Sequence, residues 1–316
     1  MNSRSLFLAA LLAAVRPLAA EECGLKQAAR PAAADALRKL TVGGRERSYL
    51  VHVPPSYDAA QAAPVVLILH GAGTNAAITV GFTGLNAKSD EAGFIAVYPN
   101  GTGVGDVLLT WNSGGLPEVI SRGKPDDVAF LRAVLDEVAA TYHVDARRIH
   151  ATGLSNGGMM CYKLAAELSD RIASIAPVSG TMTAANPQPA RPVPVLHFHG
   201  TADAIVPFGG PAGNDPRGVT FKSVAASIRA WCEVDGCPAK PAIEDLPDRV
   251  DDGTTVRRKT YGPGKDGAEV VLIEISGGGH TWPGRKSPVA FLGKSTLDIS
   301  ANDLIWDFFV KHPLPR

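Results

Sequence analysis

The chain has 316 residues, 45% of them hydrophobic, and its 31 Lys and Arg residues balance 31 Asp and Glu residues. This length can hold one large α/β domain or two modest ones, with a sizeable core. Zero formal charge, without a long run of like charge, argues against nucleic acid or an anionic membrane as a partner. We therefore expect a substrate that is neutral, small or apolar.

Residues 1–20 have the pattern of a secretory signal peptide. Arg4 precedes an apolar stretch from Leu6 to Val15, and Leu18-Ala19-Ala20 follows as a cleavage region. The apolar stretch is too short to span a bilayer as a helix. We expect a secreted protein, periplasmic or extracellular, that is monomeric and has no membrane attachment once the signal is removed.

Four cysteines fit an oxidising compartment, where disulfides persist. Cys232 and Cys237 flank a turn-like spacer and are the preferred disulfide pair. Cys161 is expected to be a buried thiol that behaves as a small hydrophobic side chain, with a bond to Cys23 as a weaker alternative. No Cys/His spacing is typical of a zinc site, and we expect neither a metal nor another cofactor.

From residue 40 onward strands and helices alternate, which predicts one α/β domain over residues 34–313 with a mainly parallel sheet covered on both faces. The continuous apolar run at 65–69 is typical of a strand buried on both sides. We expect strands at 46–54, 64–70, 94–98, 147–152, 172–178, 193–199, 254–261 and 269–275, and helices from 126 or 127 to 142 and at 159–168, 219–231 and 300–312.

Residues Gly153-Leu154-Ser155-Asn156-Gly157 read GxSxG and lie between a predicted strand and a predicted helix. A serine at such a junction is held on a sharp, strained turn that exposes its hydroxyl. The glycines allow strand and helix backbones to approach closely. The pattern predicts a nucleophile elbow, although a tight turn with a solvated serine would look similar.

A nucleophilic serine needs a base and an acid, and in this arrangement they follow in the order serine, acid, histidine. Asp203 comes directly after a predicted buried strand, at the strand end where α/β active sites gather. His280 lies in a glycine-rich loop after another strand, whereas His312 is expected to be a cation at a helix end. We therefore predict Asp203 as the acid and His280 as the base. The alternative acids Asp215, Asp235 and Asp266 lie in polar, turn-like segments without a preceding buried strand.

The oxyanion of the tetrahedral intermediate needs backbone N–H donors from the residue after the nucleophile and from the loop after an early strand. These are predicted to be Asn156 and Ala72, with Gly73 and Thr74 as alternatives to Ala72. His70 is expected to brace this loop and not to act on substrate.

Four further residues are ambiguous from type and position alone. His197 and His199 share one side of a strand, and without a third ligand we favour buried, hydrogen-bonded structural histidines over a metal pair. Trp282, two residues after the expected base, and Trp111 are candidate walls of a pocket for an apolar or aromatic ester. The alternative for each tryptophan is core packing.

Several motifs together resemble the secreted α/β-hydrolase esterases of the polyhydroxybutyrate depolymerase and feruloyl esterase group. They are Leu69-His70-Gly71-Ala72-Gly73, Asp126-Asp127-Val128, the elbow extended through Gly158-Met159-Met160, His199-Gly200-Thr201-Ala202-Asp203 and Gly278-Gly279-His280-Thr281-Trp282-Pro283-Gly284. The resemblance implies the α/β-hydrolase fold and the triad Ser155, Asp203 and His280. It also implies ester substrates, either hydroxyalkanoate esters or acyl groups on plant polysaccharides. Ala72 departs from many relatives, so the local shape of the oxyanion loop is expected to differ.

The sequence therefore predicts a secreted serine ester hydrolase that works through an acyl-enzyme. A serine peptidase on the same scaffold and a catalytically silent binding protein are the alternatives.

Overall fold

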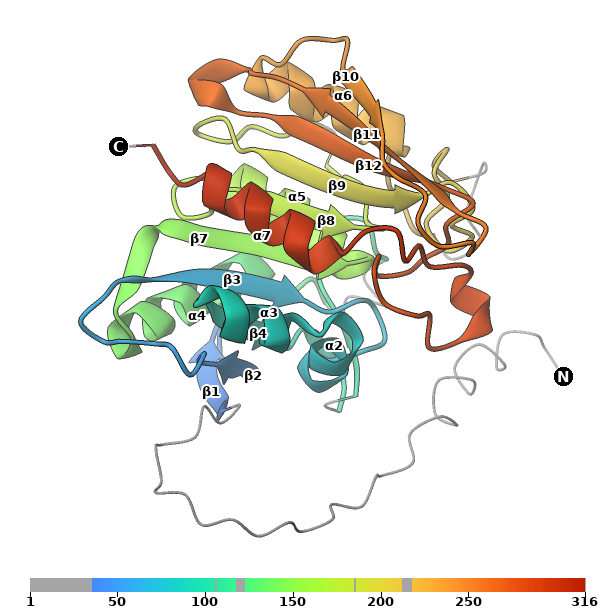
Figure 1. Ribbon diagram of the computed structural model, residues 1–316. Helices are drawn as coiled ribbons and strands as arrows, with labels where there is room; N and C mark the ends of the chain where they lie inside the picture. Colours follow the sequence, from blue (N-terminus) through green and yellow to red (C-terminus); the bar gives the residue numbers. More distant parts are fainter. Residues whose placement is uncertain (1–35, 106, 118–122, 185, 212–217, 316) are drawn as a thin grey trace, which may run out of the picture. The chain divides into compact units, whose positions relative to one another are not determined.

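A ten-stranded sheet runs through the centre of the protein, with its strands in the order β1-β2-β4-β3-β7-β8-β9-β12-β11-β10 (Figure 1). The computed structural model describes residues 36–105, 107–117, 123–184, 186–211 and 218–315, all within one compact unit. The expected signal peptide and Cys23 lie outside these ranges. The strands are β1 (Ala36–Val42), β2 (Arg45–His52), β3 (Ala63–Leu69), β4 (Ile95–Pro99), β7 (Val144–Leu154), β8 (Ile175–Val178), β9 (Val195–Gly200), β10 (Ala242–Asp245), β11 (Thr255–Tyr261) and β12 (Val270–Ser276).

The six strands from β4 to β12 in this order are parallel to their neighbours, and antiparallel strands extend both edges. A separate hairpin pairs β5 (Thr102–Val104) with β6 (Leu108–Thr110). The predicted mainly parallel sheet is confirmed.

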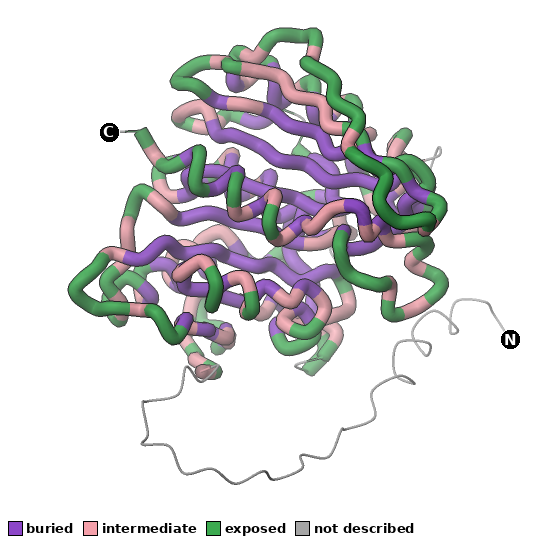
Figure 2. The backbone as a smooth tube through the Cα atoms, in the orientation of Figure 1, coloured by how far each residue is buried: buried purple, intermediate pink, exposed green. Residues whose placement is uncertain are grey.

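Helices cover both faces of the sheet, and the side chains of β3 show how the two layers divide. Val65, Leu67 and Leu69 join the core on the side of α4 (Asp127–Thr141), α5 (Asn156–Glu167) and α6 (Val224–Asp235). Val66 and Ile68 pack on the side of α2 (Ala76–Thr83), α3 (Leu85–Ala92) and α7 (Ala301–Lys311). The central strands are buried along most of their length (Figure 2). This is the α/β-hydrolase architecture.

Side-chain caps explain where the longer helices begin. Asp126 accepts a hydrogen bond from Ala129 N at the start of α4, Ser223 from Ala226 N at the start of α6, and Ser300 from Asp303 N at the start of α7. Each bond satisfies one of the N–H groups that a helix leaves without an internal partner.

The structure confirms the main predicted strands and helices, although several of their ends differ by a few residues. The helix expected over 219–231 begins only at Val224, where Ser223 provides its cap. The edge strands β1 and β10, the short helices α2 and α3 and the β5–β6 hairpin were not predicted. Among the described residues, no helix combines the length and apolar character needed to cross a membrane.

Parallel order places the carboxyl ends of β7, β9 and β12 at one edge of the sheet. Ser155 follows β7, Asp203 follows β9 and His280 follows β12. The fold therefore brings together three segments that lie far apart in the sequence.

Candidate active site

Ser155 occupies a strained turn between β7 and α5, with φ 58° and ψ −120°. Such angles are uncommon for a residue with a side chain and are typical of functional positions. A Cβ on Gly157 would stand 2.2 Å from Leu69 O, and one on Gly153 would stand 2.7 Å from the same atom. The two glycines therefore let α5 start directly against β3, and the half-buried Ser155 remains reachable. This is the predicted elbow geometry.

Asp203 and His280 meet as buried partners, with His280 Nδ1 2.8 Å from Asp203 Oδ2. The second carboxylate oxygen, Oδ1, accepts hydrogen bonds from Ile205 N and Val206 N, both at 2.9 Å. Because a carboxylate only accepts, His280 carries its proton on Nδ1 and leaves Nε2 able to receive one. The structure thus pairs the two residues in the sense that a base and its orienting acid require.

Burial alone would raise the pKa of Asp203, but the hydrogen bond from His280 and the electrostatic interaction with its ring act against burial. His199 and the Val206 N–H act in the same direction, so the pKa of Asp203 lies below its ordinary value. The carboxylate is therefore ionised at neutral pH and can stabilise an imidazolium at His280.

The two other acidic candidates that the structure describes, Asp235 and Asp266, do not reach this site. Asp235 is buried at the end of α6 and accepts a hydrogen bond from Val193 N, next to the start of β9 and thus at the opposite sheet edge. Asp266 is exposed in a single 3₁₀ turn at Lys265–Gly267. Asp215 lies outside the described residues.

The serine side chain is not yet engaged with its expected base. Among the described residues, Ser155 Oγ has no hydrogen-bond partner, whereas its backbone N–H donates to Val178 O at 2.8 Å. The acid and base loops contact each other, since Ala202 N donates to Gly278 O at 2.9 Å. Nucleophile–base hydrogen bonds are often long without substrate and shorten in the complex.

The loop after β3 exposes one amide that is free to bind an oxyanion. Gly73 N donates to Leu109 O at 2.8 Å and Thr74 N to Gly71 O at 3.3 Å, so both alternatives to Ala72 are engaged. In the part of the chain that the structure describes, the Ala72 N–H has no acceptor, and this residue is exposed. The Asn156 N–H is the first of α5 and has no acceptor within its helix. Both placements support the predicted donor pair.

His70 braces this loop through both ring nitrogens. Gly101 N donates to His70 Nε2 at 2.9 Å, so Nδ1 carries the proton and donates to Gly71 O at 2.8 Å. Burial lowers the pKa of His70 to about 4, which keeps the ring neutral. The Gly71 carbonyl also accepts from Thr74 Oγ1 at 2.7 Å. Because a peptide unit is planar and trans, fixing Gly71 C=O also fixes the Ala72 N–H on its opposite side.

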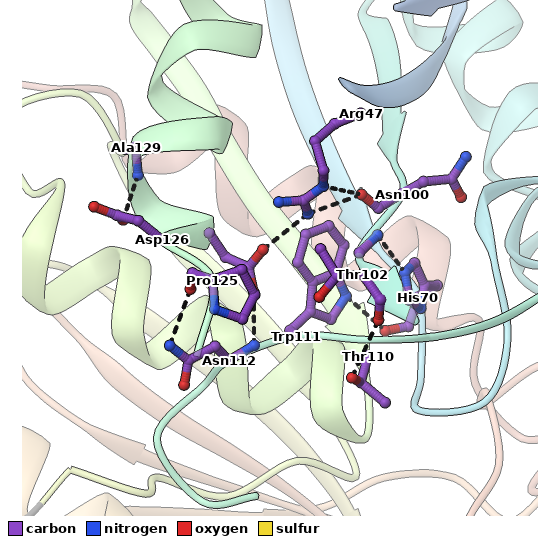
Figure 3. Close-up of polar contacts among 12 residues, drawn as sticks. Arg47, His70, Asn100, Thr102, Thr110, Trp111, Asn112, Pro125, Asp126 and Ala129 are labelled. Atoms are coloured by element: carbon purple, nitrogen blue, oxygen red, sulfur yellow. Dashed lines mark hydrogen bonds and ion pairs between the residues drawn. The ribbon is translucent and has the colours of Figure 1, made fainter. Parts of the chain in front are cut away.

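A buried ion pair that was not predicted from the sequence joins β2 to the start of α4. Arg47 on β2 donates to Asp127 Oδ1 at 2.8 Å and to Asn100 O at 3.0 Å (Figure 3). Asp127 Oδ2 in turn accepts from Asn112 N at 2.6 Å. An arginine within a predicted strand was a signal that a buried charge needs a partner. The partner could not be identified from the sequence because it lies 80 residues away.

Trp111 and Trp282 are packing residues, which corrects the expectation that they wall a substrate pocket. Trp111 is fully buried, donates from Nε1 to His70 O at 3.0 Å and has its backbone held by the Asn156 side chain. Trp282 is 1% exposed and donates from Nε1 to Asn302 Oδ1 at 2.8 Å. Neither indole has surface left for a substrate.

The remaining histidines and cysteines are also placed. His197 and His199 are buried and hydrogen-bonded, as predicted, and no cluster of metal-binding side chains occurs among the described residues. His312 lies at the end of α7, but burial lowers its pKa despite the carboxylate of Glu269, so it is not the helix-end cation that we expected.

Cys161, Cys232 and Cys237 are free thiols in this structure. Cys161 is fully buried, as expected, and any pairing with Cys23 lies outside the described residues. A hydrogen bond from the Cys232 thiol lowers the pKa of the Cys237 thiol. The expected disulfide between these two neighbours remains a prediction.

A sheet of this topology, with a strained serine after a central parallel strand and a buried acid–histidine pair beside it, defines the class: the protein is an α/β-hydrolase. The profile of the family described as "Esterase PHB depolymerase" matches residues 47–200. A protein named as an esterase, NocK of Nocardia uniformis subsp. tsuyamanensis, is 35% identical over 287 residues, which cover 86% of this chain and 82% of that protein.

Two further proteins are similar over less sequence or in fold alone. Feruloyl esterase B of Piromyces equi is 28% identical over 241 residues, 74% of this chain and 42% of that enzyme. The structure of an acetyl xylan esterase from Aspergillus awamori superimposes with a TM-score of 0.60 at 15% identity, over 87% of this chain and 99% of that one. The chain belongs to the esterase PHB depolymerase family and is a carboxylic ester hydrolase.

Proposed function

We propose that the enzyme is a serine esterase in which Ser155, His280 and Asp203 form the catalytic triad. The observation that carries this proposal is the 2.8 Å hydrogen bond between Asp203 Oδ2 and His280 Nδ1 at the sheet edge where the elbow presents Ser155. This bond leaves His280 Nε2 as the proton acceptor for the serine hydroxyl.

In the first half-reaction, Ser155 Oγ attacks the ester carbonyl carbon while His280 Nε2 takes the hydroxyl proton. The carbonyl oxygen becomes an oxyanion bound by the N–H groups of Ala72 and Asn156. Collapse of this intermediate breaks the ester bond, and the leaving alkoxide receives the proton from His280. Asp203 stabilises the transient imidazolium.

In the second half-reaction, water replaces the alcohol and gives its proton to His280. The resulting attack on the acyl-enzyme releases the carboxylic acid and restores the Ser155 hydroxyl. Every proton is supplied by the substrate, by water or by these three side chains. The residues therefore account for ester hydrolysis without a cofactor.

We propose hydroxyalkanoate esters, or feruloyl and acetyl esters of plant polysaccharide, as substrates. Support comes from the matched family and from the names of the relatives. The balanced charge of the chain fits neutral esters of this kind. We further propose export from the cytoplasm, on the evidence of the N-terminal sequence pattern.

The test is a substrate panel combined with active-site labelling. Purified enzyme is assayed on hydroxybutyrate oligomers, methyl ferulate, acetylated xylan, p-nitrophenyl esters and a peptide substrate, and a fluorophosphonate probe is applied to wild type and Ser155→Ala. We expect ester turnover, no peptide turnover and labelling of wild type alone. Labelling without ester hydrolysis would overturn the proposed substrates, whereas faster peptide cleavage would identify a peptidase. An unlabelled and inactive wild type would indicate a silent binding protein.

A further inference from the structure

Three buried side chains form a continuous hydrogen-bonded chain that ends at the acid loop. Tyr162 Oη lies 2.9 Å from His197 Nδ1, His197 Nε2 lies 3.0 Å from His199 Nδ1, and His199 Nε2 lies 2.8 Å from Val206 O. Tyr162 belongs to α5, the helix that begins at the elbow, and both histidines belong to β9. The chain therefore links the nucleophile's helix to the loop that carries Asp203.

The direction of this chain follows from its last member. A backbone carbonyl can only accept, so His199 carries its proton on Nε2 and presents a bare Nδ1. Burial lowers the pKa of both histidines, which keeps them neutral. His197 must then donate from Nε2 and accept at Nδ1, and the Tyr162 hydroxyl must be the donor. One tautomer of each ring satisfies the whole chain.

The chain acts on Asp203 at two points. Val206 accepts from His199 through its carbonyl and donates through its N–H to Asp203 Oδ1 at 2.9 Å, so His199 anchors the turn that holds this oxygen. His199 Nε2 also lies 3.5 Å from Asp203 Oδ2, the oxygen that binds His280. The His199 Nε2–H, which donates to Val206 O, therefore lies close to the carboxylate of Asp203.

Two histidines in the core are costly unless their polar atoms are all satisfied, and apolar residues would fill the same space more simply. Val195, two residues before His197 on the same strand face, is apolar and packs in the core. The departure from an apolar pattern occurs where the strand approaches Asp203. We propose that His199 is a positioning residue for Asp203, and that His197 and Tyr162 set its tautomer.

This inference rests on the proposed triad, and its test uses the full chain with a p-nitrophenyl ester. His199→Phe removes the Nε2–H while keeping a planar ring, and we expect kcat to fall about 10- to 100-fold with KM within about twofold. His199→Gln keeps an N–H near the position of Nε2 and is expected to recover most of this loss. Rescue by glutamine distinguishes a required N–H from simple packing.

Tyr162→Phe removes the first donor and leaves the ring in place. We expect a smaller loss of kcat, about threefold to tenfold, and no further loss in the His199→Phe background because the chain is already broken. His150→Phe is the matched control, because His150 is a buried histidine on β7 that is hydrogen-bonded to Ser174 Oγ at 2.8 Å. The kcat of His150→Phe is expected to stay within about twofold of the wild-type value.

Proton NMR gives a readout that does not depend on turnover. The downfield resonance of the His280 Nδ1–H is expected to shift in His199→Phe and to stay in place in His150→Phe. A folded His199→Phe with wild-type kcat and an unshifted resonance would overturn the inference, as would a folded His199→Gln no better than His199→Phe. If His199→Phe fails to fold, a wild-type kcat for Tyr162→Phe would overturn it. An inactive wild type would instead contradict the proposed function, while the NMR comparison would still test the positioning role.

Discussion

His70 Nδ1 lies 2.8 Å from Gly71 O, and this bond orients an amide that belongs to the next residue. The Gly71 carbonyl and the Ala72 N–H are opposite ends of one planar peptide unit. A donor that points in advance at the developing negative charge needs no reorganisation during the reaction. The Ala72 N–H is therefore oriented by the hydrogen bonds that the Gly71 carbonyl of the same peptide unit accepts.

Thr74→Val is expected to lower kcat about tenfold, because it removes the hydroxyl that donates to Gly71 O at 2.7 Å while keeping the side-chain volume. Steady-state kinetics on a soluble ester measure the effect. Thr79→Val is the control, since Thr79 Oγ1 donates to the backbone oxygen of Asn75, the residue that caps the start of α2. Equal kcat values for the two variants would contradict the role of Gly71 O.

Asp203→Asn is expected to lower kcat by about 10³- to 10⁴-fold, because the amide cannot stabilise the imidazolium and favours the wrong tautomer of His280. Asp235→Asn, at the alternative acid, is expected to keep full activity. If the second substitution abolished turnover and the first did not, the assignment of the acid would be reversed.

The stability of the protein is expected to depend on pH through Asp235. Burial raises the pKa of this carboxyl to about 8 in the folded protein, against 3.8 as its ordinary value. The stability that the protonated Asp235 carboxyl contributes is thus fully present below about pH 4 and is lost as the pH rises through about 8.

Asparagine at position 235 keeps the acceptor for Val193 N but does not titrate. The difference in unfolding free energy between Asp235→Asn and wild type should therefore change in favour of the variant by more than about 1 kcal/mol from about pH 5 to about pH 9. Urea unfolding at both pH values measures this, with the exposed Asp266→Asn as the control. A stability difference that is the same at both pH values would show that Asp235 is ionised throughout.

Trp282→Phe is expected to cost about 1–3 kcal/mol of folding free energy, because it leaves a cavity and removes the bond to Asn302. KM for aromatic and aliphatic esters should stay unchanged. A several-fold rise in KM for methyl ferulate with unaltered stability would restore Trp282 as a substrate contact.

The strained turn at Ser155 and the pairing of Asp203 with His280, the acid and base of the proposed triad, could be predicted because each residue is marked locally. A GxSxG sits between strand and helix patterns, and Asp203 and His280 each follow a buried strand in the required order. Residue type alone does not show whether an indole faces a substrate pocket or the core, so Trp111 and Trp282 were wrongly expected to form pocket walls.

Other features depend on packing between distant segments. The Arg47–Asp127 pair joins β2 to the start of α4, and the direction of the Tyr162–His197–His199 chain appears only once α5 lies against β9. The short helices α2 and α3 meet at Gly84, whose φ of 64° ends one helix where the next begins, so neither has a long periodic pattern. The edge strand β1 alternates between half-buried and exposed residues, a weaker signal than the apolar run of β3.

The most direct measurement is kcat/KM of Ser155→Ala for a p-nitrophenyl ester beside wild type, with thermal unfolding to confirm the fold and the exposed Ser56→Ala as control. We predict a loss of several orders of magnitude for Ser155→Ala, an unchanged unfolding temperature and full activity for Ser56→Ala. A folded Ser155→Ala that retains most of the wild-type activity would contradict the serine mechanism.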